Sequence, residues 1–104
     1  MAAIESPEIR FRRLRMRSWR RGMKEMDLIL GPYSDGPLKE LGDAELESYE
    51  SLLGENDQDL YRWITARLNG RQDDTGPAAL SPILDRIVAF AAGRLSVSDG
   101  SRIG

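Results

Sequence analysis

Arg20-Arg21-Gly22-Met23-Lys24-Glu25-Met26-Asp27 is the stretch at which the chain changes character. An arginine-rich segment precedes it, and a long acidic segment follows it. Gly22 has no Cβ, so its backbone can take a positive φ or approach another surface more cheaply than any other residue type. With two arginines before it and Lys24-Glu25 after it, this glycine predicts a corner between two helices that serves as a docking point.

The composition limits the kinds of site that the chain can build. Its 104 residues suffice for one domain with one core, and without Cys or His it has no thiol nucleophile, disulfide, Cys/His zinc site or imidazole base. Carboxylate pairs such as Asp57/Asp59 lack a companion group, so we expect no catalytic residues. No apolar run approaches the roughly 20 residues of a membrane span. We expect a cytoplasmic protein without membrane insertion, metal site or cofactor of its own.

The net charge of −2 conceals a strong asymmetry. Residues 8–25 carry eight cations and two anions, whereas residues 27–59 carry ten carboxylates and one lysine. Either the two parts neutralise each other in the fold, or a basic surface is kept for an acidic partner, a protein or a nucleic acid. A nucleic acid is the less favoured partner, because the acidic stretch would repel a polyanion and no recognition helix or aromatic platform accompanies the arginines.

Helix start and stop signals predict an all-α fold, a compact bundle of about five short helices. Ser6-Pro7-Glu8 begins the first helix and Gly22 breaks it. The second begins near Met23 and is ended or kinked by Gly31-Pro32, and residues 34–37 form a turn. The third helix follows Gly42 and ends at Gly54, and the fourth runs from Gln58 to about Leu68 with Asn56 or Asp57 as its cap. Residues 71–80 form a mobile connection to the last helix, which spans about residues 82–95. Residues 1–95 thus form a single domain, and residues 96–104 are a flexible tail.

Apolar residues at helical spacing identify one core-facing side of each helix. Met16 and Trp19 lie off that side of the first helix. They either pack against a second helix or add an apolar patch to the arginine surface. The predicted core consists of Phe11, Leu14, Met26, Leu30, Leu46, Tyr49, Leu53, Leu60, Ile64 and Ile87.

Two sequence elements stand at a specific spacing. The first is Arg-Arg-Gly-Met-Lys-Glu-x-Asp-Leu at residues 20–28, with Pro-Tyr at residues 32–33, and the second is Asp-Gln-Asp-Leu-Tyr-x-Trp-Ile at residues 57–64. Together they resemble the succinate dehydrogenase flavinylation factor family, over about residues 8–70. The family has Asp-Pro where this chain has Asp57-Gln58, a departure that leaves the helix cap intact. Residues 71–104 carry nothing diagnostic.

The resemblance implies a small all-helical assembly factor, a chaperone and not an enzyme. Such a factor binds the flavoprotein subunit of succinate dehydrogenase or, in some members, of fumarate reductase. It promotes covalent attachment of FAD, the partner's own cofactor, to a histidine of that subunit. A second hypothesis is an antitoxin-like or regulatory protein-interaction module. The motif match places partner binding at Arg21, Gly22 and Glu25 of the Arg-Gly-x-x-Glu (RGxxE) element, to which we add their neighbours Arg17, Trp19, Arg20 and Lys24.

A purely structural interpretation of the motif is that Arg21 and Glu25 form an i, i+4 ion pair that supports the corner. If the corner instead binds a partner, substitutions at Arg21, Gly22 or Glu25 are expected to weaken binding. They should also leave the domain folded, because we expect the corner to contribute little to the core.

Overall fold

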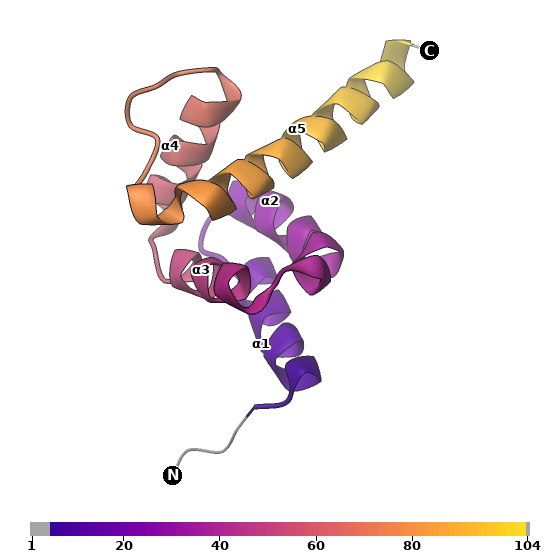
Figure 1. The fold of residues 1–104 in the computed structure, drawn as a ribbon. Helices are drawn as coiled ribbons and strands as arrows, with labels where there is room; N and C mark the ends of the chain where they lie inside the picture. Colours follow the sequence, from indigo (N-terminus) through magenta and orange to yellow (C-terminus); the bar gives the residue numbers. More distant parts are fainter. Residues whose placement is uncertain (1–4, 104) are drawn as a thin grey trace.

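The computed structural model describes the backbone of residues 5–103 and the side chains of residues 5–94. Within these residues the chain is helical and contains no strand, which confirms the predicted all-α fold (Figure 1). The α-helices are α1 (Pro7–Trp19), α2 (Lys24–Asp35), α3 (Asp43–Leu53), α4 (Asp57–Leu68) and α5 (Ser81–Ile103), and the 3₁₀-helices are η1 (Pro37–Glu40) and η2 (Ala78–Leu80).

Helix α2 is the central element of the bundle, because it contacts α1, α4 and α5. Helix α3 lies against both α1 and α5. The C-terminal part of α5 extends beyond the other helices, at the opposite end of the molecule from the start of α1 (Figure 1). In this arrangement the corner between α1 and α2 lies near the start of α4.

The predicted core is confirmed, apart from Phe11, which is partly buried and packs against it. Tyr33 and Tyr49 stack at its centre with ring centroids 5.6 Å apart. The buried Ser18 hydroxyl donates to the Leu14 carbonyl oxygen over 2.8 Å and lies 2.6 Å from the Tyr49 hydroxyl. The buried polar groups at this contact are therefore satisfied, as a stable core requires.

Helix α2 does not end at Gly31-Pro32 but continues to Asp35, so the alternative that this dipeptide ends the helix is wrong. Gly31 serves a packing role, because a Cβ there would lie 2.4 Å from the ring of Trp19. The Asp35 carboxylate then accepts hydrogen bonds from Arg15 and from the Trp19 indole N–H. Contacts with α1 thus stabilise the last turn of α2 against the lost proline hydrogen bond.

Two further boundaries differ from the prediction. The connection expected over residues 71–80 contains η2, and Gly76 in it has a φ of 96°. Helix α5 continues to Ile103 instead of ending near residue 95, because no proline or strong stop signal interrupts it. Helical spacing predicts Leu95 on the same apolar side of this helix as Leu84, Ile87 and Ala91, and its side chain lies outside the described side chains.

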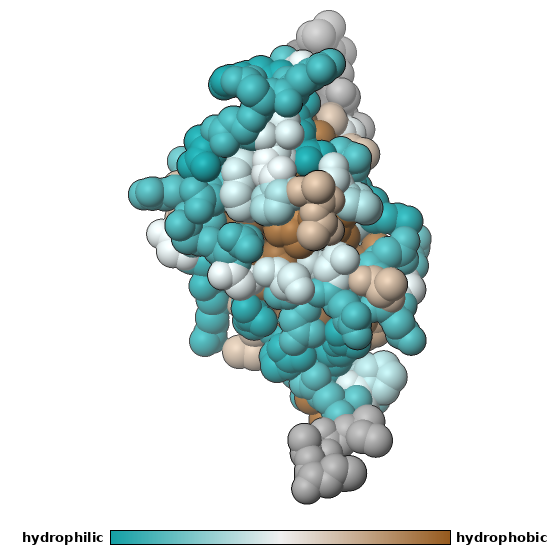
Figure 2. Space-filling view, turned by 60° about the vertical axis from the view of Figure 1, so that its left-hand side comes forward, coloured by the Kyte–Doolittle hydropathy of each residue, from teal (hydrophilic) through white to brown (hydrophobic). Residues whose placement is uncertain are grey.

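The charge asymmetry is only partly neutralised within the fold. Figure 2 shows a face covered largely by hydrophilic residues, with the most hydrophobic atoms gathered mainly near its centre. Several arginines of the basic segment are neutralised within the fold: Arg10 and Arg13 pair with Glu50, Arg13 also with Glu5, Arg15 with Asp35, and Arg21 with Asp57. Arg12, Arg17 and Arg20 are exposed and pair with no carboxylate of the described residues.

Candidate functional site: the corner between α1 and α2

Residues 20–23 connect α1 to α2 and face the start of α4. Asn56 caps α4 by accepting from the Asp59 N–H over 2.8 Å, and Asp57 is the first residue of that helix. The Asp57 side chain is directed at the corner, where it accepts hydrogen bonds from Arg21 and Gly22. Between these segments lies an open groove, the corner groove, lined by Gly22, Met23, Lys24, Glu25, Asn56, Asp57 and Gln58.

The Arg21 side chain is directed into the molecule and is only 9% exposed. Its Nε donates to Asp57 Oδ1 over 2.6 Å, and its Nη1 and Nη2 donate to the carbonyl oxygens of Leu53 and Glu55, each over 2.8 Å. Carbonyl groups at the C-terminal end of a helix lack partners within the helix. Arg21 supplies such a partner at the end of α3 and joins the corner to the connection between α3 and α4.

Two carboxylates fix the backbone of the corner. Asp57 Oδ2 accepts from the Gly22 N–H over 2.7 Å, and Asp27 Oδ1 accepts from the Arg21 N–H over 2.6 Å. Positive φ angles among the described glycines occur at Gly70 and Gly76, so the suggestion that Gly22 uses a positive φ is wrong. Gly22 is needed instead for a close approach, since a Cβ there would lie 3.3 Å from Asp57 Oδ2.

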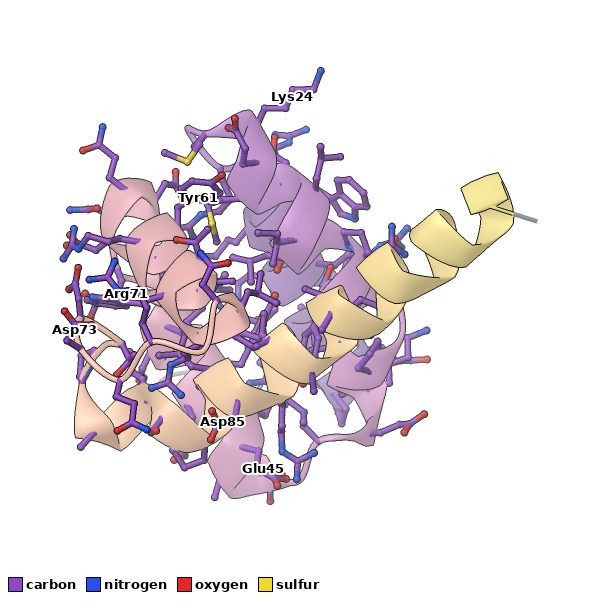
Figure 3. The ribbon with its side chains drawn as sticks, turned by 90° about the horizontal axis from the view of Figure 1, so that it is seen from above. Lys24, Glu45, Tyr61, Arg71, Asp73 and Asp85 are labelled. Atoms are coloured by element: carbon purple, nitrogen blue, oxygen red, sulfur yellow. The ribbon has the colours of Figure 1, made fainter. Side chains whose placement is uncertain are left out.

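The structural interpretation of the motif as an Arg21–Glu25 ion pair is also wrong, because Arg21 pairs with Asp57. Glu25 and Lys24 are both exposed at the start of α2, and neither forms an ion pair with another described residue. Figure 3 shows the Lys24 side chain extending away from the body of the molecule. The corner therefore presents one cation and one anion side by side on a fixed backbone.

The other predicted site residues divide into two groups. Arg17 and Arg20 are exposed on α1. Trp19 is 38% exposed, but its ring packs against Gly31 and its Nε1 donates to Asp35 Oδ1 over 3.1 Å. The two residues predicted to behave alike therefore differ. Trp19 packs against a second helix, α2, whereas Met16 is 48% exposed among the arginines of α1.

Sequence reasoning missed Asp27 and Asp57 as the residues that hold the corner. Asp57 was one of two predicted caps of α4, a role that Asn56 takes in the structure, and its position in the second sequence element was the available signal. Two exposed apolar side chains were missed as well: Leu28 is 55% exposed and Tyr61 is 37% exposed. They lie one helical turn beyond Lys24 and Asp57, and residues four apart on a helix are neighbours on its surface.

The corner groove is lined by exposed residues of both charges. It is open, and the exposed apolar side chains of Leu28 and Tyr61 lie one helical turn beyond two of its lining residues, Lys24 and Asp57. No group of three or more His, Cys, Asp or Glu side chains in the described residues could hold a metal ion. Nor do the described helices include one that is long and apolar enough to cross a membrane.

Comparison with known families identifies the chain. The model of the family described as the flavinator of succinate dehydrogenase matches residues 12–91, which include the corner, α4 and much of α5. The chain belongs to this flavinator family. The match confirms the resemblance inferred from residues 8–70 and extends it into the last helix.

Individual relatives carry names that agree with the flavinator family. The chain is 36% identical over 76 residues to the FAD assembly factor SdhE of Aliivibrio fischeri, covering 73% of this chain and 83% of that protein. It is 37% identical to the FAD assembly factor SdhE of Photobacterium profundum, covering 73% of this chain and 81% of that protein. The mitochondrial succinate dehydrogenase assembly factor 2 of Yarrowia lipolytica is 35% identical over 91 residues, which are 84% of this chain but 59% of that longer protein.

Proposed function

We propose that this chain is an assembly factor that binds the flavoprotein subunit of succinate dehydrogenase and promotes the covalent attachment of FAD to it. Membership of the flavinator family and the names of the relatives support this proposal. The structural observation that carries it is the corner groove, where Gly22, Lys24 and Glu25 are exposed on a backbone fixed by Asp27 and Asp57. Fumarate reductase, which has a related flavoprotein subunit, is a second client to test.

The predicted binding residues are assigned two roles. Gly22 allows a partner backbone to approach closely, Lys24 donates to a partner carboxylate or carbonyl, and Glu25 accepts from a partner donor. Arg17 and Arg20 add positive charge beside the corner. Arg21 and Trp19 are positioning residues, because their polar groups are occupied by Asp57 and Asp35.

The chain would act by binding and not by chemistry of its own. The flavin and the residue that accepts it belong to the partner subunit in this proposal. By holding two parts of the partner in a reactive arrangement, a rigid factor can lower the barrier through positioning alone. The fixed corner suits this role, because a surface that is already ordered loses little entropy on binding.

Co-expression tests the proposal directly. The flavoprotein subunit is produced in cells without its native factor, together with this chain, with its Gly22→Arg variant or with neither, and covalent flavin is measured by in-gel fluorescence. We expect covalent flavin with the wild-type chain and a strong loss with Gly22→Arg, whose side chain would occupy the corner groove. Equal flavin in all three cultures would refute the function.

Fractionation of cells producing the full-length chain tests the proposed cytoplasmic location, since the relatives include bacterial and mitochondrial proteins.

A further inference from the structure

A second exposed surface lies along α1 and adjoins the corner groove. Ile9 is 53% exposed and Met16 is 48% exposed. Together with arginine side chains they line a shallow hollow that follows the helix. We name this surface the α1 arginine face: Ile9, Arg12, Arg13, Met16, Arg17 and Arg20, with Arg21 also lining the hollow.

The spacing of these residues produces an apolar strip with cations on both sides. At 100° per residue, Ile9 and Met16 fall about 20° apart, with Arg12 on one side of them and Arg17 on the other. Arg20 lies at the C-terminal end of the strip. From Ile9 to Arg20 the face extends about 16 Å along the helix axis, enough to contact about three turns of a partner helix.

Three of the cations on this face are available for a partner. Arg10, Arg13 and Arg15 of the same helix pair with carboxylates of the fold. Arg12, Arg17 and Arg20 pair with none in the described part of the chain. Unpaired arginines beside exposed apolar side chains are complementary to a segment that carries carboxylates beside apolar residues.

Other occupants fit this face less well. A nucleic acid would contact the arginines through phosphates and leave Ile9 and Met16 without a complement. A lipid surface needs a larger apolar area than these two side chains offer. A second copy of this chain has an acidic α3, but the exposed large apolar residues of the described part lie on α1, α2 and α4, not on α3.

We propose that the α1 arginine face binds an acidic amphipathic segment of the same flavoprotein subunit whose docking at the corner groove is proposed above. This inference rests on the proposed function. The two surfaces are continuous, since Arg20 lies in the α1 arginine face and Gly22, two residues further on, lines the corner groove. One partner can thus contact both, and the α1 arginine face adds electrostatic steering and an apolar anchor to the contact at the corner.

The test measures the affinity of the purified flavoprotein subunit for the full-length chain and its variants at several salt concentrations. The variant Arg12→Gln/Arg17→Gln/Arg20→Gln removes the unpaired charges. The variant Ile9→Gln/Met16→Gln replaces the apolar strip with glutamine, a residue that favours helix formation. The matched control Arg71→Gln/Arg86→Gln/Arg94→Gln removes three exposed cations from the connection after α4 and from α5. Circular dichroism verifies folding, and a random DNA duplex and vesicles of anionic phosphatidylglycerol serve as competing probes.

We expect the arginine variant to bind roughly tenfold more weakly, with slower association and a flatter salt dependence. The apolar variant should bind several-fold more weakly with the salt dependence retained, and the control should stay within about twofold of wild type. If both variants bind like wild type while Gly22→Arg loses binding, the inference fails and the corner proposal stands. If the wild-type chain does not bind the subunit, both fail. Tighter binding of DNA, vesicles or a second copy to this face would also overturn the inference.

Discussion

The structure contains two connections that are each held by a largely buried arginine, and they have different surroundings. At the corner between α1 and α2, Arg21 is 9% exposed and reaches back to the end of α3 and the start of α4. Between α4 and α5, Arg67 is 12% exposed and donates to the Thr75 carbonyl oxygen, the Ser81 hydroxyl and Asp85. Both arginines thus order a loop through backbone and carboxylate acceptors.

What each ordered loop presents is different. The connection after α4 lies over the core, because a Cβ on Gly76 would lie 2.9 Å from Leu84 and 3.1 Å from Trp63. The corner between α1 and α2 instead leaves Lys24 and Glu25 exposed beside an open groove. The same kind of arginine contact covers the core in one place and supports the proposed binding surface in the other, so a largely buried arginine does not by itself identify a site.

The largest expected effect on stability is that of Arg21→Ala. Removing this side chain takes away the donors to Asp57 Oδ1 and to two carbonyl oxygens, and we expect a loss of about 2–4 kcal/mol in the free energy of unfolding. This replaces the sequence-based expectation that Arg21 can be removed without cost to folding. Arg67→Ala should cost less, about 1–3 kcal/mol, because its partner Asp85 is 70% exposed and stays hydrated. Urea unfolding measures both, and a larger loss for Arg67→Ala would contradict the ranking.

The next effect compares one substitution at the two connections. Gly76→Ala places a Cβ at a φ of 96° against Leu84 and Trp63, and we expect a loss of about 1–3 kcal/mol. Gly22→Ala requires a shift of a few tenths of an ångström in the Asp57 carboxylate and should cost less than about 1 kcal/mol. Thermal unfolding followed by circular dichroism distinguishes them. Equal melting temperatures for the two variants would show that the connection after α4 is not a closure of the core.

The paired arginines of α1 predict a smaller, pH-dependent effect. Burial opposes ionisation of Glu50, but hydrogen bonds from Arg13 and Arg10 outweigh it and hold the pKa of Glu50 below its ordinary value of 4.5. A carboxyl group whose pKa is lower in the folded state contributes stability above its unfolded pKa and loses it as the pH falls through the folded pKa. Glu50→Gln should therefore reduce stability at pH 7 and flatten the loss of stability below about pH 4.5.

Urea titrations at a series of pH values measure this effect. Glu47→Gln is the control, because Glu47 is an exposed residue of the same helix and has no ion pair among the described residues. If the free energy of unfolding of Glu50→Gln varied with pH in parallel with that of wild type, the ion pairs of Arg10 and Arg13 with Glu50 would not stabilise the fold.

Much of this architecture could be predicted because helical periodicity reports burial directly. Leu14, Met26 and Leu60 lie on apolar faces, and each is fully buried. The continuation of α2 through Pro32 could not be predicted, because it depends on Trp19 and Arg15 reaching α2 from another helix. Local signals describe a helix end well only where no tertiary contact competes with them.

The corner was predicted in position, but its internal contacts were not. The glycine flanked by charges correctly marked the corner, and the exposure of Lys24 and Glu25 agrees with a docking surface. The inward direction of Arg21 depends on Asp57, which lies 36 residues away in sequence. Spacing within a single helix suggested Glu25 as the partner of Arg21, whereas the folded chain supplies a carboxylate from α4.

The central claim is that the exposed charges of the corner bind the flavoprotein subunit. The most direct test exchanges them in Lys24→Glu/Glu25→Lys, which leaves the net charge unchanged. The matched control is Lys39→Glu/Glu40→Lys, the same exchange at two exposed neighbours in η1. Binding of each folded chain to the purified subunit is measured at one salt concentration.

We expect the exchange at the corner to weaken binding roughly tenfold or more, which corresponds to about 1.4 kcal/mol, while the control stays within about twofold of wild type. A corner variant that is folded and binds as tightly as wild type would contradict the assignment of the docking surface to the corner between α1 and α2.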